Sequence, residues 1–169
     1  IDTSEYGGNK MKAKVKYRKY RNIPDMNTVK EIIVYGAKQG KANKQYAFKD
    51  MNGNYCEKTF DEVFYDATGL GQHLYTLGLK SKKVAILSEN SYYWIAAFYS
   101  IASGNMIAIP LDPKLPNEDL VDLMVRSGCD AIYYTQDFAP AIQMMKENPE
   151  VKLSVYLKFE DFDELVRMG

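Results

Sequence analysis

Three ionisable side chains stand just after apolar runs that could form parallel strands, and together they could build an acidic pocket. Glu89 lies in the polar stretch Ser88-Glu89-Asn90-Ser91, which separates two apolar segments, while Asp112 and Lys158 follow later runs. In a parallel sheet, ligands bind in the crevice beyond the carboxyl ends of the strands. Acidic groups with a lysine at that edge are what a receiver-like signalling module requires, and they could also contact another ligand.

A structural role explains the same polar stretch more simply. Ser and Asn are preferred at helix N-caps, because their side-chain oxygens accept hydrogen bonds from first-turn N–H groups. Asn90 or Ser91 would cap the helix that follows, and Glu89 would favour its positive end. We therefore interpret the stretch chiefly as the exit from a strand into a capped helix.

The histidine and cysteine content limits other kinds of site. His73 is the only histidine, so a Ser-His-Asp triad or a histidine-ligated metal would depend on it, and no neighbouring residue supports either. Cys56 and Cys129 are far apart, in segments expected to be buried or half-buried. This usage indicates reduced thiols in a reducing compartment, without a disulfide framework or a Cys/His metal cluster.

Two glycine patterns and one acidic cluster also have structural explanations. Gly69-Leu70-Gly71 lies inside an expected helix, follows no strand and has Leu74 where a dinucleotide fingerprint needs its third glycine. Gly7-Gly8-Asn9-Lys10 has no preceding strand and no Ser or Thr after the lysine, unlike a phosphate loop. The acidic residues near the last helix start serve its dipole: Asp161, Asp163 and Glu164. We assign no catalytic, cofactor-binding or metal-binding residue.

The first half of the chain should form a helix, a hairpin and a second, longer helix. Asn27 or Thr28 caps the first helix and Gly40 ends it, and a second helix begins at a capping box of Thr59 and Glu62. Between the helices, Asn-Gly predicts the hairpin turn of strands 45–49 and 55–58. The apolar stripe of the second helix comprises Phe60, Val63, Phe64, Ala67, Leu70, Gly71, Leu74 and Leu77, with Gly78 as its C-cap glycine.

The second half alternates apolar strands with helices. The expected strands are 83–87, 106–109, 131–134 and 152–157, and the expected helices are 91–103, 117–127, one capped by Asp137, and 159–168. Apolar strands at this spacing are typical of a parallel sheet covered on both faces. The sequence therefore predicts a doubly wound α/β fold, mainly parallel with helices on both faces, plus a β-hairpin and an N-terminal arm. Trp94 is expected in the core.

The charge and hydrophobicity of the chain limit the classes of protein to which it could belong. Twenty-two basic residues balance twenty-two acidic ones, so no overall field attracts nucleic acid or an anionic membrane. The segment 10–21 (KMKAKVKYRKYR) is strongly basic, and we interpret it as a solvated arm in preference to a phosphate or membrane contact. No apolar run is long enough for a transmembrane segment and no signal peptide is visible, so a cytoplasmic protein is expected.

The run KVAILSENSYYWIAAFYSIASGNMIAIPLDPKLPNEDLVDLMVRSGCDAIYYT resembles the N-terminal region of AMP-forming acyl-CoA synthetases, in the adenylate-forming superfamily. The shared features are a strand, a Glu-Asn turn, a Trp-bearing helix, a small-residue-Gly step and a strand ending in Pro-x-Asp. The segment 58–63 (KTFDEV) is similar to that family's Thr-Tyr-x-Glu-Leu opening of its first long helix. The resemblance covers residues 22–169 and is nearer to the long-chain fatty acid branch than to peptide-synthetase adenylation domains.

The resemblance implies a two-step reaction in a larger parent protein. A carboxylate attacks the α-phosphate of ATP to give acyl-adenylate and pyrophosphate, and the thiol of coenzyme A then displaces AMP. ATP, magnesium and CoA are the implied cofactors, and a fatty acid or other carboxylate is the implied substrate. The family's phosphate loop, magnesium-linked Glu, ribose-binding Asp and catalytic Lys have no counterpart here, because the chain ends at Gly169 before they are expected.

The residues that match the family build its scaffold, so no catalytic role is carried over to them: Thr59, Glu62, Gly104, Pro110 and Asp112. We expect a basic arm at 1–22 and a truncated N-terminal α/β subdomain at 23–169, whose main partner is the rest of the parent synthetase. Alone, this part should be inactive and, through exposed apolar surface, prone to self-association. Two alternatives stay open: a receiver-like signalling module, and a non-catalytic ligand- or protein-binding remnant.

Overall fold

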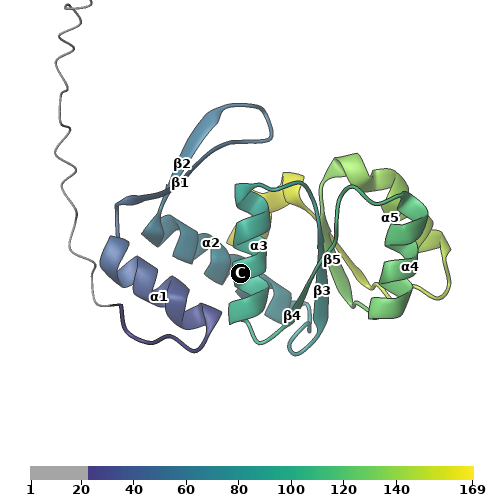
Figure 1. The fold of residues 1–169 in the computed structure, drawn as a ribbon, viewed down its shortest axis with the longest axis horizontal. Coiled ribbons are helices and arrows are strands. Elements are labelled where there is room, and N and C mark those ends of the chain that lie inside the picture. Colours follow the sequence, from purple (N-terminus) through teal and green to yellow (C-terminus); the bar gives the residue numbers. More distant parts are fainter. Residues whose placement is uncertain (1–22) are drawn as a thin grey trace, which may run out of the picture.

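The computed structural model describes residues 23–169, which fold into an α/β unit with a separate two-stranded hairpin (Figure 1). The main sheet has four parallel strands in the order β4-β3-β5-β6. Its strands are β3 (Lys83–Leu87), β4 (Ile107–Pro110), β5 (Ala131–Tyr134) and β6 (Val155–Lys158). The parallel sheet expected from the apolar runs is therefore confirmed.

Helices cover both faces of this sheet. Side chains alternate along β3, so Val84 and Ile86 join one core cluster and Ala85 and Leu87 join the other. The first cluster lies under α2 (Phe60–Thr76), α3 (Tyr92–Ser103) and α6 (Phe162–Arg167), and the second under α4 (Asn117–Ser127) and α5 (Ala139–Glu147). This is the predicted doubly wound arrangement.

The helix α1 (Val29–Gly40) and the hairpin β1 (Lys44–Lys49) and β2 (Tyr55–Thr59) stand apart from the sheet, beside α2 and α3. The hairpin is antiparallel, and Gly53 supplies the positive φ that its turn needs. The Asp50 carboxylate accepts the N–H groups of Asn52 and Asn54, which closes the turn. The hairpin and its Asn-Gly turn are thus confirmed.

Three helix starts follow from local chemistry. The Thr28 hydroxyl accepts from the Glu31 N–H at 3.2 Å, and the Thr59 hydroxyl accepts from the Glu62 N–H at 3.2 Å. In both, the glutamate reaches back to the backbone of the cap residue, completing a capping box. Ser91, and not Asn90, caps α3 by accepting the Trp94 N–H.

The end of the chain departs from the prediction in three places. Asp137 lies in a 3₁₀ helix, η1 (Gln136–Phe138), and makes no side-chain cap bond, so its assignment as a helix cap is wrong. The following helix begins with Pro140 in its first turn, where the missing N–H costs no bond. The last helix is split into η2 (Phe159–Asp161) and α6, and β6 begins at Val155, later than expected.

Burial of two helices differs in detail from the sequence pattern. Trp94 is only half-buried: it packs against the edge of the first core cluster and stacks on Phe98 with ring centroids 5.5 Å apart, so its expected place in the core holds only in part. Tyr92 takes the buried position, with its ring 4.6 Å from that of Phe48 on the hairpin. Most of the α2 stripe is buried, but Phe64 and Leu77 are exposed.

Among the helices of residues 23–169, none combines the length and apolarity needed to cross a membrane.

Candidate functional site

The polar stretch Ser88-Glu89-Asn90-Ser91 forms the turn that connects the end of β3 to the start of α3. Ser88 is buried and its hydroxyl donates to the Glu89 carbonyl at 2.7 Å, while Glu89 and Asn90 are exposed. Ser91 then caps α3. The interpretation as a strand exit and helix cap is confirmed for Ser88 and Ser91, and Asn90 contributes no cap bond.

The candidate acidic pocket does not form. Asp112 follows β4 and Lys158 ends β6, and these strands are the two opposite edges of the sheet. Three strand spacings of about 4.8 Å put them roughly 14 Å apart. The exposed Asp112 carboxylate instead accepts the Lys114 N–H at 2.9 Å, inside its own turn. The geometry therefore disfavours the receiver-like alternative.

A buried polar cluster links the hairpin to two helices. The Lys58 ammonium of β2 lies 2.7 Å from the Asp66 carboxylate of α2, and the Tyr92 hydroxyl of α3 donates to the same oxygen. Asp66 is 5% exposed, so the ammonium and the hydroxyl replace the water that this carboxylate loses on folding. Burial, and next the hydrogen bond to Asp66, raises the pKa of Tyr92, which keeps its phenol protonated.

Sequence reasoning missed this cluster, although one local signal was present. Asp66 lies three residues after Val63 and four before Leu70, on the apolar stripe of α2. A carboxylate at a core-facing position needs a partner. The partners come from 8 and 26 residues away along the chain. Only the tertiary fold identifies them.

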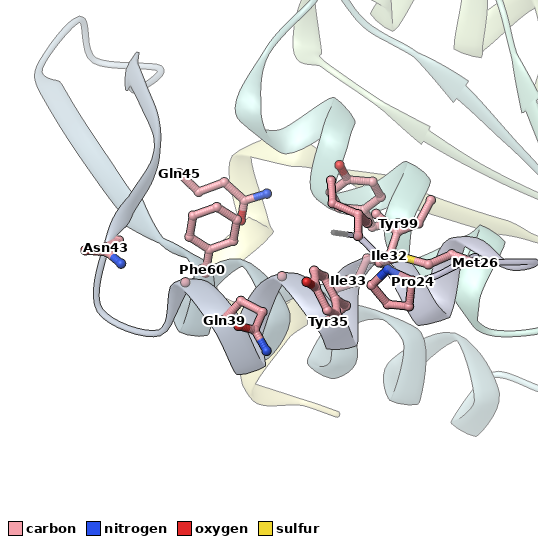
Figure 2. Close-up of a pocket in the computed structure, with 13 residues that line it drawn as sticks. Pro24, Met26, Ile32, Ile33, Tyr35, Gln39, Asn43, Gln45, Phe60 and Tyr99 are labelled. Carbon is pink, nitrogen blue, oxygen red and sulfur yellow. The ribbon is translucent and has the colours of Figure 1, made fainter. Parts of the chain in front are cut away.

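An apolar groove lies beside α1, and we call it the α1 groove (Figure 2). Its volume is about 610 Å³, and its lining is Ile23, Pro24, Met26, Ile32, Ile33, Tyr35, Gly36, Gln39, Gly40, Asn43, Gln45, Phe60 and Tyr99. The described lining residues include no charged side chain. A volume of this size is typical of sites for small apolar molecules or apolar side chains.

Close packing shapes one wall of the α1 groove. A Cβ added to Gly40 would lie 2.2 Å from the Phe60 ring, so only glycine allows the start of α2 to approach the end of α1. Near the groove, the Tyr46 and Tyr99 hydroxyls lie 3.3 Å apart, and burial, followed by this hydrogen bond, raises the pKa of Tyr46. The groove thus combines apolar walls with neutral hydroxyl and amide groups at its edge.

The remaining reactive groups are isolated. His73 is buried, and burial lowers its pKa, which favours the neutral ring. Cys129 is buried, and burial raises the pKa of its thiol, while Cys56 is half-buried and both are free. Within residues 23–169, no group of three or more His, Cys, Asp or Glu side chains could hold a metal ion.

The described residues do not fit ATP phosphates with magnesium. Their carboxylates make no metal-binding group, and at each of α1, α2 and α3 one first-turn N–H already donates to the cap side chain, Thr28, Thr59 or Ser91. The described residues form a hydrophobic core, a hairpin that the Lys58–Asp66 ion pair holds against α2, and an open apolar groove.

Comparison with solved structures gives the same α/β core. The N-terminal domain of FACL13 from Mycobacterium tuberculosis matches with a TM-score of 0.75 at 20% identity, over 85% of this chain and 36% of that chain. The anthranilate CoA ligase AuaEII matches with a TM-score of 0.72 at 20% identity, over 86% of this chain and 28% of that chain. The chain therefore spans about a third of the length of these proteins.

A curated relative also aligns with part of the chain. It is the nonribosomal peptide synthetase otaB of Aspergillus carbonarius, 28% identical over 86 residues, which is 51% of this chain and 5% of the synthetase. The family model described as AMP-binding enzyme matches residues 37–167, well over half of the chain and nearly all of its core elements. The match of residues 37–167 shows that this chain belongs to the AMP-binding enzyme family, the adenylate-forming ligases.

Proposed function

We propose that this chain is the N-terminal α/β portion of an AMP-forming acyl-CoA ligase that acts on a fatty acid. The observation that carries the proposal is the match of its folded core to the N-terminal domains of acyl-CoA ligases, within the AMP-binding family. Residues 23–169 form the subdomain, and residues 1–22, a basic arm by sequence, lie outside the described part.

In this proposal the parent ligase joins a carboxylate to ATP, giving acyl-adenylate and pyrophosphate, and then transfers the acyl group to the thiol of CoA. The described residues supply the scaffold: the sheet, its two helical layers and the hairpin fixed by the Lys58–Asp66–Tyr92 cluster. We assign the groups that bind ATP, magnesium and CoA to the rest of the parent. For magnesium, this is supported by the carboxylates of residues 23–169, which make no metal-binding group. Reduced, unpaired cysteines are consistent with a cytoplasmic parent.

The test is pyrophosphate release from ATP with a panel of fatty acids, aromatic acids and amino acids. The natural protein that carries this sequence should release pyrophosphate with fatty acids and form acyl-CoA when CoA is added. The 169-residue chain alone should show no turnover, because preorganised charge stabilisation carries most of such chemistry. Robust turnover by the 169-residue chain would contradict the scaffold role.

A second candidate is an adenylating segment of a peptide synthetase. The 28% identity with the Aspergillus carbonarius synthetase favours it over half of the chain. The same substrate panel separates the two, because this candidate predicts pyrophosphate release with an amino acid and none with fatty acids. Product analysis adds a second criterion: acyl-CoA forms only in the first case.

A further inference from the structure

We propose that α1 is a hinged lid, which opens as a unit from the surface of α2 and α3 while the rest of the fold stays closed. The hinge is at residues 40–41. This motion goes beyond the proposed ligase activity and does not depend on it. Figure 1 shows α1 at the outer edge of the fold, beside α2. Three features of α1 support the motion: its burial, its attachment and the hollows around it.

The first feature is that α1 adds no side chain to the hydrophobic core. None of its twelve residues, all of them described, is buried, and none belongs to either core cluster. The shorter helix α6 differs, because it buries Phe162, Leu165 and Val166. Since stabilisation grows with the apolar area removed from water, separating α1 from the fold costs far less than separating α6.

The second feature is that backbone hydrogen bonds fix only one end of α1. The Phe60 N–H donates to the Asn43 carbonyl at 3.1 Å, and the Asp61 N–H donates to the Lys41 carbonyl at 3.2 Å. These bonds tie the residues just after α1 to the start of α2. Within residues 23–169, no hydrogen bond or ion pair joins α1 itself to another helix or strand, so apolar contacts alone hold its opposite end. The hinge therefore falls beside the tied residues, where Gly40 allows a wide range of φ and ψ.

The third feature is that hollows lie along two faces of α1. Besides the α1 groove, a hollow of about 380 Å³ lies between α1, α2 and α3, and we call it the second hollow. Lys30, Ile33 and Val34 of α1 line it, as do Ala67 of α2 and Ser103 of α3. Ile33 also lines the α1 groove, so its side chain separates the two spaces. Outward movement of α1 merges them into one hollow on α2 and α3.

An α1 that has left α2 and α3 does not stay helical, because a helix of about twelve residues is marginal in water. Its backbone N–H groups then exchange with solvent at each opening. Opening as a unit exposes the N–H groups of the whole helix together. Fraying from the free end, in contrast, exposes the first turn far more often than the last. Hydrogen exchange therefore distinguishes a lid from a frayed helix.

The first experiment is hydrogen–deuterium exchange of the 169-residue chain, measured at single amides by NMR. The amides of residues 33–38 should share one protection factor, about a hundredfold lower than that of the β3 and β5 amides. Exchange in α1 should change little at low urea concentrations, because a local opening exposes little surface. Exchange in β3 and β5 should rise steeply with urea.

Two neighbouring isoleucines of α1 give a matched pair of variants. Ile33 is half-buried and lines both hollows, so Ile33→Ala should raise α1 exchange by about tenfold. Ile32 is 51% exposed, so Ile32→Ala should leave α1 exchange nearly unchanged. Helix propensity changes equally in the two variants. Their difference therefore reports the contacts of Ile33 with α2 and α3, and far-ultraviolet circular dichroism confirms that each variant is folded.

A variant in the other core cluster separates lid opening from global unfolding. Ile142 of α5 is 3% exposed in the second core cluster, which α1 does not touch. Ile142→Val should raise exchange in β3 and β5 by about fivefold, because those amides exchange through global unfolding. Exchange in α1 should stay the same, since the open and closed lid both keep this cluster intact.

Thiol labelling provides a second measurement of the opening. Ala67 is 3% exposed and lines the second hollow, so the thiol of an Ala67→Cys variant should react with a maleimide whenever α1 opens. Cys129 is 1% exposed in the second core cluster and serves as the control in the same molecule. Mass spectrometry of the labelled peptides should show reaction at position 67 at least about tenfold faster than at Cys129.

Three outcomes would overturn the proposal. The first is α1 exchange that has the urea dependence of β3 and β5 and rises equally in Ile142→Val, because α1 would then open only by global unfolding. The second is a steady rise in exchange toward the first turn of α1, which would show fraying. The third is reaction at position 67 no faster than at Cys129.

Discussion

The Lys58 ammonium lies 2.7 Å from the Asp66 carboxylate, and this contact fixes the β-hairpin to α2 at a site that water barely reaches. The same carboxylate oxygen accepts the Tyr92 hydroxyl of α3, so one side chain holds three elements. The Lys58 ammonium also stands 5.5 Å from the centre of the Tyr92 ring. Lys58, Asp66 and Tyr92 therefore form one interacting cluster, and single substitutions can test the contribution of each side chain to stability.

Lys58→Met should destabilise the chain by about 3 kcal/mol, because removing one partner leaves a buried carboxylate without its counter-charge. Urea unfolding followed by circular dichroism measures the change. The control is Arg126→Met, which breaks the exposed pair of Arg126 with Asp122 and should leave the midpoint unchanged. An equally small loss for Lys58→Met would show that water reaches Asp66.

Tyr92→Phe should cost roughly 1–3 kcal/mol, since it removes a hydroxyl that a buried carboxylate needs while keeping the ring that stacks on Phe48. Tyr46→Phe is the matched control, because Tyr46 is half-buried and its 3.3 Å contact with Tyr99 joins two neutral hydroxyls. The Tyr46 variant should unfold at nearly the same urea concentration as the unmodified chain. A neutral effect of Tyr92→Phe would mean that the hydroxyl contributes no net stability.

Ser91→Ala should destabilise the chain by about 1 kcal/mol through loss of the α3 cap. Asn90→Ala, one residue earlier, should change stability by no more than about 0.5 kcal/mol, because Asn90 is exposed and makes no cap bond in α3. Thermal melts of the two variants test this directly. The reverse order of effects would contradict the assignment of Ser91 as the cap.

Stability should fall as the pH is lowered from 7 through about 6.5, the unfolded-state pKa of histidine. Burial lowers the pKa of His73, so between the folded-state and unfolded-state pKa values the unfolded chain binds a proton at this histidine and the folded chain does not. The loss continues until the pH passes below the folded-state pKa and then levels off. Below about pH 4, a second loss begins, because backbone and side-chain hydrogen bonds hold the pKa values of Asp50 and Glu62 below their usual range.

His73→Leu isolates the first of these losses. The variant should unfold at a urea concentration that changes little between pH 7 and pH 5.5, whereas the unmodified chain should unfold progressively earlier. The second loss, near pH 4, should persist in the variant. Identical profiles for the two proteins across pH 7 to 5.5 would show that His73 is protonated as easily in the folded chain as in the unfolded one.

Local chemistry made much of the fold predictable. The Thr59 and Glu62 capping box, the Asn52-Gly53 turn and the buried strand 83–87 each depend on a few neighbouring residues, and all three occur. Asp137 shows the limit of such reasoning, because the α-helix starts at Ala139, one residue later than a cap at Asp137 requires, and it has Pro140 in its first turn and no side-chain cap.

The features of the candidate site depend on contacts that are distant in sequence. Asp66 meets Lys58 and Tyr92 only after the hairpin and α3 pack on α2. The α1 groove is similarly built from α1, the start of α2 and Tyr99 of α3. Apolarity alone predicted a core position for Trp94. Which aromatic side chain of α3 is fully buried depends on tertiary contacts, and the fully buried one is Tyr92, which lies against Phe48.

The most direct test of the proposed function is carboxylate-dependent pyrophosphate release by the natural protein that carries this sequence. The protein is purified, incubated with ATP, magnesium and a fatty acid, and then supplied with CoA. We expect pyrophosphate release that requires the fatty acid, followed by acyl-CoA and AMP in equal amounts. Failure to release pyrophosphate with any member of the carboxylate panel, by a folded protein, would contradict the assignment of this chain to an AMP-forming acyl-CoA ligase.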